Sequence, residues 1–468
     1  MGQIGRSGLQ GHHGAWSVPL ATVGLVLAMS GFARAESGPY TLSAYQSITY
    51  QPNVFQAGNG GDRTGDIISG TGIDFGFSTR VDATRLFANG NLQGNLYQET
   101  TSLNNASFGL NLGATSTGDR LSSTIRYAAS QQLGNYGTPG VAATTDKNLQ
   151  TNQDAGLALR YRLSPRSNLV GGLGYQSVRY SAAAFDSQET SSGVGSVDVT
   201  HKFAPDFTGG LGLRYSAGVT PYYAPGTTPG SFISDRFDGQ YVDFLASWKA
   251  GVSNNVNARI SLTRTSHTQA SQLDFSGLTW FIGWSYVPNS RLSATATFTQ
   301  NTGSGPSVLG SLLTASPSSG SGTDTTGAGG SSGGDNGSGS GGGEGLGGGA
   351  PSGNAGGSAG SPVSTTLDNN RLNTSIGFAA SYQLSRTLSL TGSLLFNNAG
   401  LVNSNDVSGN AWSSSLGLGL TYAPTRSISL GCALSTIIQN ASQSAETSGQ
   451  AYSYRSPTVA CTGTIAFL

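Results

Sequence analysis

The sequence is short of charge. Only 10% of its 468 residues are Asp, Glu, Lys or Arg, against about 25% in ordinary soluble domains. Basic and acidic residues both number 23, so the net charge is zero and gives no argument for nucleic acid as a partner. Hydrophobic residues are also few, at 36%, whereas Gly alone contributes 71 residues. This balance is typical of a membrane β-barrel, whose strands need an apolar residue only at every second position.

Long hydrophobic runs are missing as well, with one exception at the N-terminus. No other stretch of 18 or more apolar residues exists, which excludes transmembrane helices. The exception is an apolar core from Leu20 to Phe32, followed by the small residues of Ala33-Arg34-Ala35. This order is typical of a cleaved secretory signal. We therefore expect residues 1–35 to be a signal peptide and residues 36–468 to form the mature protein.

Residues that carry chemistry are scarce. After the signal the chain has two histidines, and we interpret His201 as lying beside a turn and His267 as lying in a surface loop. A Ser beside a His is not a catalytic pair without a third, orienting group. The sequence contains no HExxH motif, no Cys/His cluster and no acidic calcium loop. We predict no metal, no cofactor and no enzymatic activity.

Alternation of apolar and polar residues is the strongest positive signal. From Ala155 to Tyr175 it continues on one parity across the corner Ser164-Pro165-Arg166-Ser167, which predicts a β-hairpin. Similar corners recur at Phe203-Ala204-Pro205-Asp206, Tyr286-Val287-Pro288-Asn289, Tyr382-Gln383-Leu384-Ser385 and Tyr422-Ala423-Pro424-Thr425. The sequence thus predicts a single large all-β array.

About 18 such segments can be marked, and the connections between them alternate between short and long. We expect strands near 40–50, 66–80, 85–97, 106–115, 120–131, 153–163, 168–180, 190–203, 208–217, 239–249, 255–265, 275–287, 291–301, 368–384, 388–397, 410–423, 427–438 and 452–468. The short corners fall around Asp82, Gly118, Pro165, Pro205, Val252, Pro288, Arg386 and Pro424. This alternation predicts a transmembrane antiparallel β-barrel with short periplasmic turns and long extracellular loops, in the outer membrane of a Gram-negative cell.

Aromatic residues gather at both ends of the predicted strands, as interfacial belts do. One set precedes the short turns: Tyr161, Phe203, Trp248, Tyr286, Tyr382 and Tyr422. The other lies near the long loops: Tyr127, Tyr175, Tyr215, Phe298, Phe396 and Trp412. The segment 302–366 is Gly/Ser-rich, and its composition predicts a disordered extracellular loop that is either a hydrated tether or a tolerated insertion. Its deletion over 305–362 is expected to leave folding intact.

The strand positions expected to face the interior of the barrel carry polar and basic residues. They place Asn89, Asn91, Gln93 and Asn95 in a ladder of amides on one strand. Basic residues with the same parity are Arg126, Arg160, Arg162, Arg214 and Arg259, together with Arg80, Arg85, Lys202 and Lys249, and the available acids are Asp74, Asp198 and Asp243. Such residues suit sugars or anionic solutes. They also suit a wide barrel that merely needs a hydrogen-bonded polar interior.

The two cysteines, Cys432 and Cys461, fall on the last two predicted strands. If the hairpin loop is centred near 440–450, residues whose numbers sum to about 893 face each other. The numbers 432 and 461 have this sum, so the two cysteines are expected to face each other. Directly opposed residues of a non-hydrogen-bonded pair come close enough for a disulfide. The alternative is two unpaired cysteines that face lipid as small apolar residues.

Three passages together resemble one family. They are Tyr50-Gln51-Pro52-Asn53-Val54-Phe55, Tyr161-Arg162-Leu163-Ser164-Pro165-Arg166 and Asp274-Phe275-Ser276-Gly277-Leu278 with Trp284 and Pro288. They are similar to the EpsL-like outer-membrane barrels encoded with exopolysaccharide gene clusters. The resemblance covers roughly residues 40–301 and more loosely 368–468. It implies a role in export or assembly of an extracellular polysaccharide.

Three functions therefore remain possible, and one of them is a structural or adhesive role at the cell surface. Another is passage of an exopolysaccharide through a polar lumen, with outer-membrane lipid, the polysaccharide and periplasmic or inner-membrane export components as partners. The third is a general diffusion porin for small hydrophilic solutes. Neither the solute nor the oligomeric state follows from the sequence.

Overall fold

The computed structural model describes residues 39–228, 230–302, 370–402 and 408–467. The predicted signal peptide and nearly all of the Gly/Ser-rich segment lie outside the described residues. Within them no helix is long and apolar enough to cross a membrane.

The described chain folds as eighteen β-strands, each close to its predicted position. They are β1 (Tyr40–Gln51), β2 (Asp66–Val81), β3 (Thr84–Tyr97), β4 (Asn105–Thr117), β5 (Leu121–Leu133), β6 (Leu149–Arg162), β7 (Ser167–Tyr180), β8 (Thr190–Ala204), β9 (Phe207–Pro225), β10 (Phe232–Ala250), β11 (Asn254–His267), β12 (Phe275–Asn289), β13 (Leu292–Asn301), β14 (Asn370–Gln383), β15 (Leu388–Val402), β16 (Ser408–Tyr422), β17 (Ile428–Ala441) and β18 (Tyr454–Ala466). Short helices lie in four connections: η1 (Thr101–Leu103), η2 (Ala183–Gln188), η3 (Ser271–Leu273) and α3 (Gln443–Thr447).

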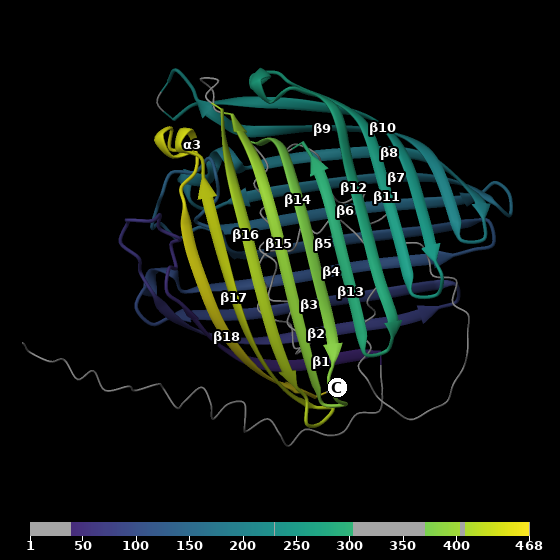
Figure 1. The fold of residues 1–468 in the computed structure, drawn as a ribbon, viewed down its shortest axis with the longest axis horizontal. Helices are drawn as coiled ribbons and strands as arrows, with labels where there is room; N and C mark the ends of the chain where they lie inside the picture. The colour runs from purple at the N-terminus through teal and green to yellow at the C-terminus, as the bar shows by residue number, and fades with distance from the viewer. Residues whose placement is uncertain (1–38, 229, 303–369, 403–407, 468) are drawn as a thin grey trace, which may run out of the picture.

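The sheet closes on itself. Each strand pairs antiparallel with its neighbours in sequence, and β1 pairs with β18 from Ser43↔Ala466 to Tyr50↔Val459. No edge strand is left, so every strand backbone finds its partners within the wall, as a membrane-spanning sheet requires. In Figure 1 the front wall, β13–β18, crosses the direction of the strands behind it, because the strands of a closed barrel are tilted. The predicted all-β transmembrane barrel is confirmed.

Short and long connections alternate as predicted, with corrections. The short turns comprise residues 82–83, 118–120, 163–166, 205–206, 251–253, 290–291, 384–387 and 423–427. The turn expected at Pro288 is shifted, since Pro288 lies in β12 at a register irregularity between Tyr286 and Asn289. The strands expected at 208–217 and 239–249 continue to Pro225 and back to Phe232. The strands expected at 388–397 and 410–423 likewise extend, to Val402 at the end of β15 and to Ser408 at the start of β16.

The outer face of the barrel is apolar. Leu173, Leu213 and Val197 expose 61%, 66% and 56% of their surface, and comparable Leu, Ile and Val side chains recur on every second strand position. A soluble protein would not expose a continuous apolar band of this kind. Both predicted aromatic sets share this face, for example Tyr422 at 48% and Trp412 at 58% exposure. The protein is an outer-membrane β-barrel.

Cys432 and Cys461 are directly opposed in the β17–β18 register, with Cα atoms 4.1 Å apart, and their sulfur atoms are bonded. Cys432 also pairs with Leu420, and Cys461 with Ile48, which places the disulfide on the outer face. The bond joins the last hairpin beside the β1–β18 seam.

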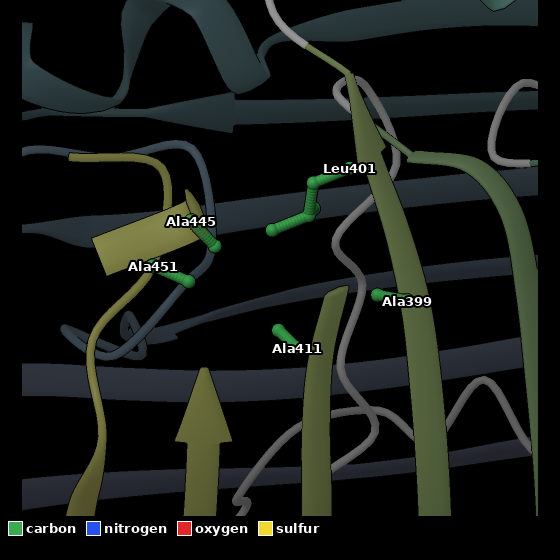
Figure 2. Close-up of a cluster of buried hydrophobic side chains, with 5 residues drawn as sticks. All are labelled: Ala399, Leu401, Ala411, Ala445 and Ala451. Atoms are coloured by element: carbon green, nitrogen blue, oxygen red, sulfur yellow. The ribbon is translucent and has the colours of Figure 1, made fainter. Parts of the chain in front are cut away.

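The last long connection, 442–453, folds back over the barrel end. Its helix α3 begins after Ser442, whose side chain accepts a hydrogen bond from the Ala445 N–H. Figure 2 shows Ala445 and Ala451 of this segment facing Ala399, Leu401 and Ala411 at the ends of β15 and β16, and all five are buried. Figure 1 places α3 near the end of β17, away from the short turn that joins β16 to β17.

Candidate functional site

The register places all nine predicted lumen residues on the inner face, opposite to the apolar band. Asn89, Asn91, Gln93 and Asn95 alternate along β3, and Arg126, Arg160, Arg162, Arg214 and Arg259 follow on β5, β6, β9 and β11. Their contacts fall into three groups: an amide network, a buried ion-pair cluster and arginines without an acidic partner.

Two amides of the ladder, Gln93 and Asn95, are hydrogen-bonded to neighbouring side chains of the wall. Gln93 accepts a hydrogen bond from the Tyr45 hydroxyl at 3.2 Å and donates to Asn95 at 2.7 Å. Asn95 in turn donates to Asn105 at 3.1 Å. Tyr45 is fully buried and lies across Gly72, where a Cβ would meet its ring. Amides engaged in this way rigidify the wall, and their hydrogen-bonding capacity for a passing solute is reduced.

Four charged residues form a neutral cluster on β8–β11. Arg214 donates to Asp243 through Nε at 3.1 Å and through Nη2 at 3.3 Å, and its guanidinium lies 3.8 Å from the centre of the Tyr241 ring. Arg259 Nε lies 3.7 Å from the same carboxylate, which is fully buried. Asp198 joins the cluster by lying over Gly212, where no Cβ would fit. Two arginines and two aspartates balance here, and breaking such a buried arrangement is costly.

Other inner arginines lack this compensation. Arg126 donates to Asn111 at 3.0 Å and lies diagonal to Asp154 on β6, an inner acid that the sequence analysis missed. Arg160 and Arg162 on β6 have no carboxylate within ion-pair distance in the described part of the chain. A cavity of about 870 Å³ lies along β7–β12, but most of its lining residues, among them Leu173, Val197 and Leu213, belong to the outer face, so it is no evidence for a site in the lumen.

The opposite wall is uncharged. Across β13, β15–β18 and the part of β14 from Asn373 to Gln383, the inner positions hold small or neutral residues, such as Thr297, Ser393 and Ser415, and no charged side chain. The described lumen therefore has one wall rich in arginine, β2–β11, and one lined by hydroxyls and glycines.

Several long connections fold over the mouth of the barrel. We call residues 52–65, 134–148, 181–189 and 442–453 the mouth cover. The segment 134–148 joins β5 to β6 but contacts β17 and the connection 442–453, on the far side of the β1–β18 seam. The Tyr452 hydroxyl donates to the carbonyl of Tyr136 at 2.6 Å, and Gln439 Nε2 donates to the carbonyl of Gly137 at 3.2 Å.

Aromatic packing holds the mouth cover together. The Tyr136 ring meets Phe55 edge-on with ring centres 5.3 Å apart and Phe185 at 6.4 Å. Phe185 and Val141 are buried against each other. These contacts join three connections that are far apart in sequence, so the mouth cover is a packed structure rather than a set of free loops. The sequence does not indicate the mouth cover, because packing between loops leaves no periodic pattern.

Burial raises the pKa of Tyr452 to about 12, so its hydroxyl stays protonated and able to donate at neutral pH. Because the folded-state pKa lies above the ordinary 10.0, this contribution to stability is complete below pH 10 and is lost as the pH rises toward 12. The same direction holds for Tyr136, whose pKa is also raised by burial.

We expect Tyr136→Ala to loosen the mouth cover and raise single-channel conductance in planar bilayers. The substitution removes two aromatic contacts and leaves a void of the kind that costs about 3–5 kcal/mol in a packed core. Tyr127→Ala, on the lipid-facing side at 38% exposure, is the matched control and is expected to leave conductance unchanged. Equal conductance of the two variants would show that the mouth cover does not restrict the opening.

Two aspartates at the long-loop end hold further connections. Asp66 accepts hydrogen bonds from the N–H groups of Gln98, Glu99 and Thr100. Asp235 does the same for Gln269 and Ala270, and it also contacts His267 Nδ1 at 2.7 Å. The interpretation of His267 as a surface loop histidine is wrong, because its side chain is only 5% exposed and sits at the end of β11. Its role is to brace a loop.

His201 lies on the outer face beside the turn, where its Nδ1 is 2.9 Å from the Ser167 hydroxyl. Among the described residues no group of three or more His, Cys, Asp or Glu is placed to hold a metal ion.

In comparisons with known proteins, the chain matches solved structures but neither a family model nor a curated protein. Among solved structures the chain is similar to the outer membrane protein OpdK from Pseudomonas aeruginosa, with 11% identity, 91% of this chain and 99% of that chain covered, and a TM-score of 0.42. OprD from Pseudomonas aeruginosa is 9% identical, with 92% of this chain and 96% of that chain covered and a TM-score of 0.41. OccAB4 from Acinetobacter baumannii is 10% identical, with 92% of this chain and 98% of that chain covered and a TM-score of 0.40. The fold rests on the closed register of this chain itself.

Proposed function

We propose that the barrel is a diffusion channel for small hydrophilic solutes, with a preference for anions. The observation that carries this proposal is the imbalance of charge on the inner face. Nine basic residues line β2–β11, more than the acids on the same face, and Asp243 is already paired with Arg214 and Arg259. Arg160 and Arg162 are then left to attract counter-ions.

A neutral opposite wall supports the same proposal. Hydroxyls on β13–β18 replace part of a solute's hydration without binding it strongly, while arginines on the other wall raise the local concentration of anions. Conduction needs this combination, since a site that binds too tightly would not release. Ion selectivity measured in planar bilayers tests the proposal.

Export of a polysaccharide, suggested by the resemblance to EpsL-like barrels, is less well supported. Two of the four amides expected to contact sugars, Gln93 and Asn95, are engaged with Tyr45, Asn105 and each other. The mouth cover also spans part of the extracellular opening, through which a polymer chain would have to leave. Both observations favour small solutes. Polymer secretion by a strain that lacks the protein separates the two functions.

A further inference from the structure

Four short turns share one chemical pattern that the channel function does not use. Each places a Tyr near the end of the incoming strand and an Arg four or five residues later, close to the start of the next strand. The pairs are Tyr161 with Arg166, Tyr286 with Arg291, Tyr382 with Arg386, and Tyr422 with Arg426. We call them the Tyr–Arg turns.

The tyrosines belong to the membrane-facing side. Tyr161, Tyr382 and Tyr422 expose 40%, 43% and 48% of their surface on the outer face, next to the apolar band. Tyr286 stacks on Trp284 with ring centres 5.8 Å apart. Tyrosines at this position mark the level of the lipid headgroups, because the ring prefers the acyl region and the hydroxyl prefers water.

The arginines lie at that level and are not neutralised. All four are exposed, and within the described chain none lies within ion-pair distance of a carboxylate. The Tyr–Arg turns contain no acidic residue, whereas three of the four other short turns contain Asp82, Asp119 or Asp206. Positive charge is therefore gathered in these turns rather than spread over the rim.

The turns are also similar in local structure. A side-chain oxygen shortly before each Arg accepts from a backbone N–H at or after it: Ser164 from Arg166, Asn289 from Arg291, Ser385 from Thr387 and Thr425 from Ile428. Short turns fixed in this way present the guanidinium from an ordered backbone beside the membrane surface.

We propose that the Tyr–Arg turns bind the phosphate headgroups of anionic phospholipids in the periplasmic leaflet. A guanidinium pairs with phosphate oxygens in a bidentate manner, and a tyrosine hydroxyl beside it donates a further hydrogen bond. Three of the turns are consecutive, between β12 and β17, but the turn between β6 and β7 is distant along the wall. Lipid surrounds the whole barrel and therefore reaches all four turns. A single protein partner bound to one side of the barrel would not reach all of them.

The test compares phospholipids with the same acyl chains. Native mass spectrometry of the folded protein in mixed micelles counts retained phosphatidylglycerol against retained phosphatidylcholine. We expect the wild-type protein to prefer phosphatidylglycerol and the variant with Arg166, Arg291, Arg386 and Arg426 all changed to Gln to lose that preference, by about fivefold for each arginine. The control changes Arg63, Arg179, Arg236 and Arg455 to Gln, which removes equal charge at the long-loop end.

Retention of the preference in the first variant, or its equal loss in the control, would overturn the proposal. Folding is monitored by the gel shift before and after boiling, and Arg→Lys versions of the four positions provide a folded variant that keeps the charge. These should retain part of the preference. Channel conductance is independent of this proposal, because the four arginines lie in turns and not on the inner face, so failure here leaves the proposed function standing.

Discussion

Asp243→Asn is expected to destabilise the barrel by about 3 kcal/mol or more. The substitution keeps the shape of the side chain but removes the fully buried carboxylate that both Arg214 and Arg259 contact. Two guanidinium groups, 12% and 13% exposed, would then face each other without their shared counter-charge. Asp198 remains nearby but makes no hydrogen bond to either arginine among the described residues, so it cannot replace the lost contacts. Urea unfolding in lipid vesicles, followed by tryptophan fluorescence, measures the change.

The matched control is Asp82→Asn. Asp82 is exposed in a short turn with a φ of 53°, a conformation that Asn adopts as readily as Asp. Its replacement should cost little. The double variant Asp243→Asn, Arg214→Gln should recover part of the loss, because one of the uncompensated charges is gone. If Asp243→Asn unfolds at the same urea concentration as Asp82→Asn, the cluster does not stabilise the barrel.

Arg160→Gln combined with Arg162→Gln should shift the ion preference of the channel toward cations. These two arginines have no acidic partner in the described chain, so their charge acts on permeating ions rather than on a neighbouring carboxylate. We expect the permeability ratio of chloride to potassium to fall roughly threefold, measured from the reversal potential. Arg214 is a poor choice for this test, because its removal would also break the ion pair with Asp243.

The control for this variant is Arg264→Gln with Arg455→Gln. Both residues lie on the outer face, on β11 and β18, so the same charge is removed away from the lumen. An unchanged reversal potential in the control and a shift in the first variant would place the effect inside the barrel. Equal shifts in both would show that Arg160 and Arg162 act only through the overall charge.

The wall of the barrel was predictable because it repeats. Alternation fixes which side chains face lipid, and a one-residue slip would invert both faces. The opposition of Cys432 and Cys461 could be predicted only once the centre of the last hairpin loop was assumed, and the register confirms it. The shift of the Pro288 turn and the extension of β9 and β10 show the limit of this signal. Strand ends beyond the membrane no longer need to alternate between lipid and lumen.

The sequence predicts which residues share the inner face of the barrel, but not which of them contact one another. Parity placed Arg160 and Arg214 on the same inner face, yet only the structure separates the unpartnered Arg160 from Arg214 in its ion pair. The mouth cover was beyond prediction, since Tyr136 and Tyr452 are 316 residues apart and meet through loops without a repeat. Asp66 and Asp235 were missed for the same reason, because their partners are backbone N–H groups of neighbouring loops.

The reversal potential of the wild-type protein in a planar bilayer, under a gradient of KCl, shows directly whether the barrel is a channel that prefers anions. An uncompensated basic wall that faces a neutral one predicts an open channel whose reversal potential is shifted from zero toward the equilibrium potential of chloride. A preference for potassium, or a reconstituted and heat-modifiable protein that conducts no ions, would contradict this function.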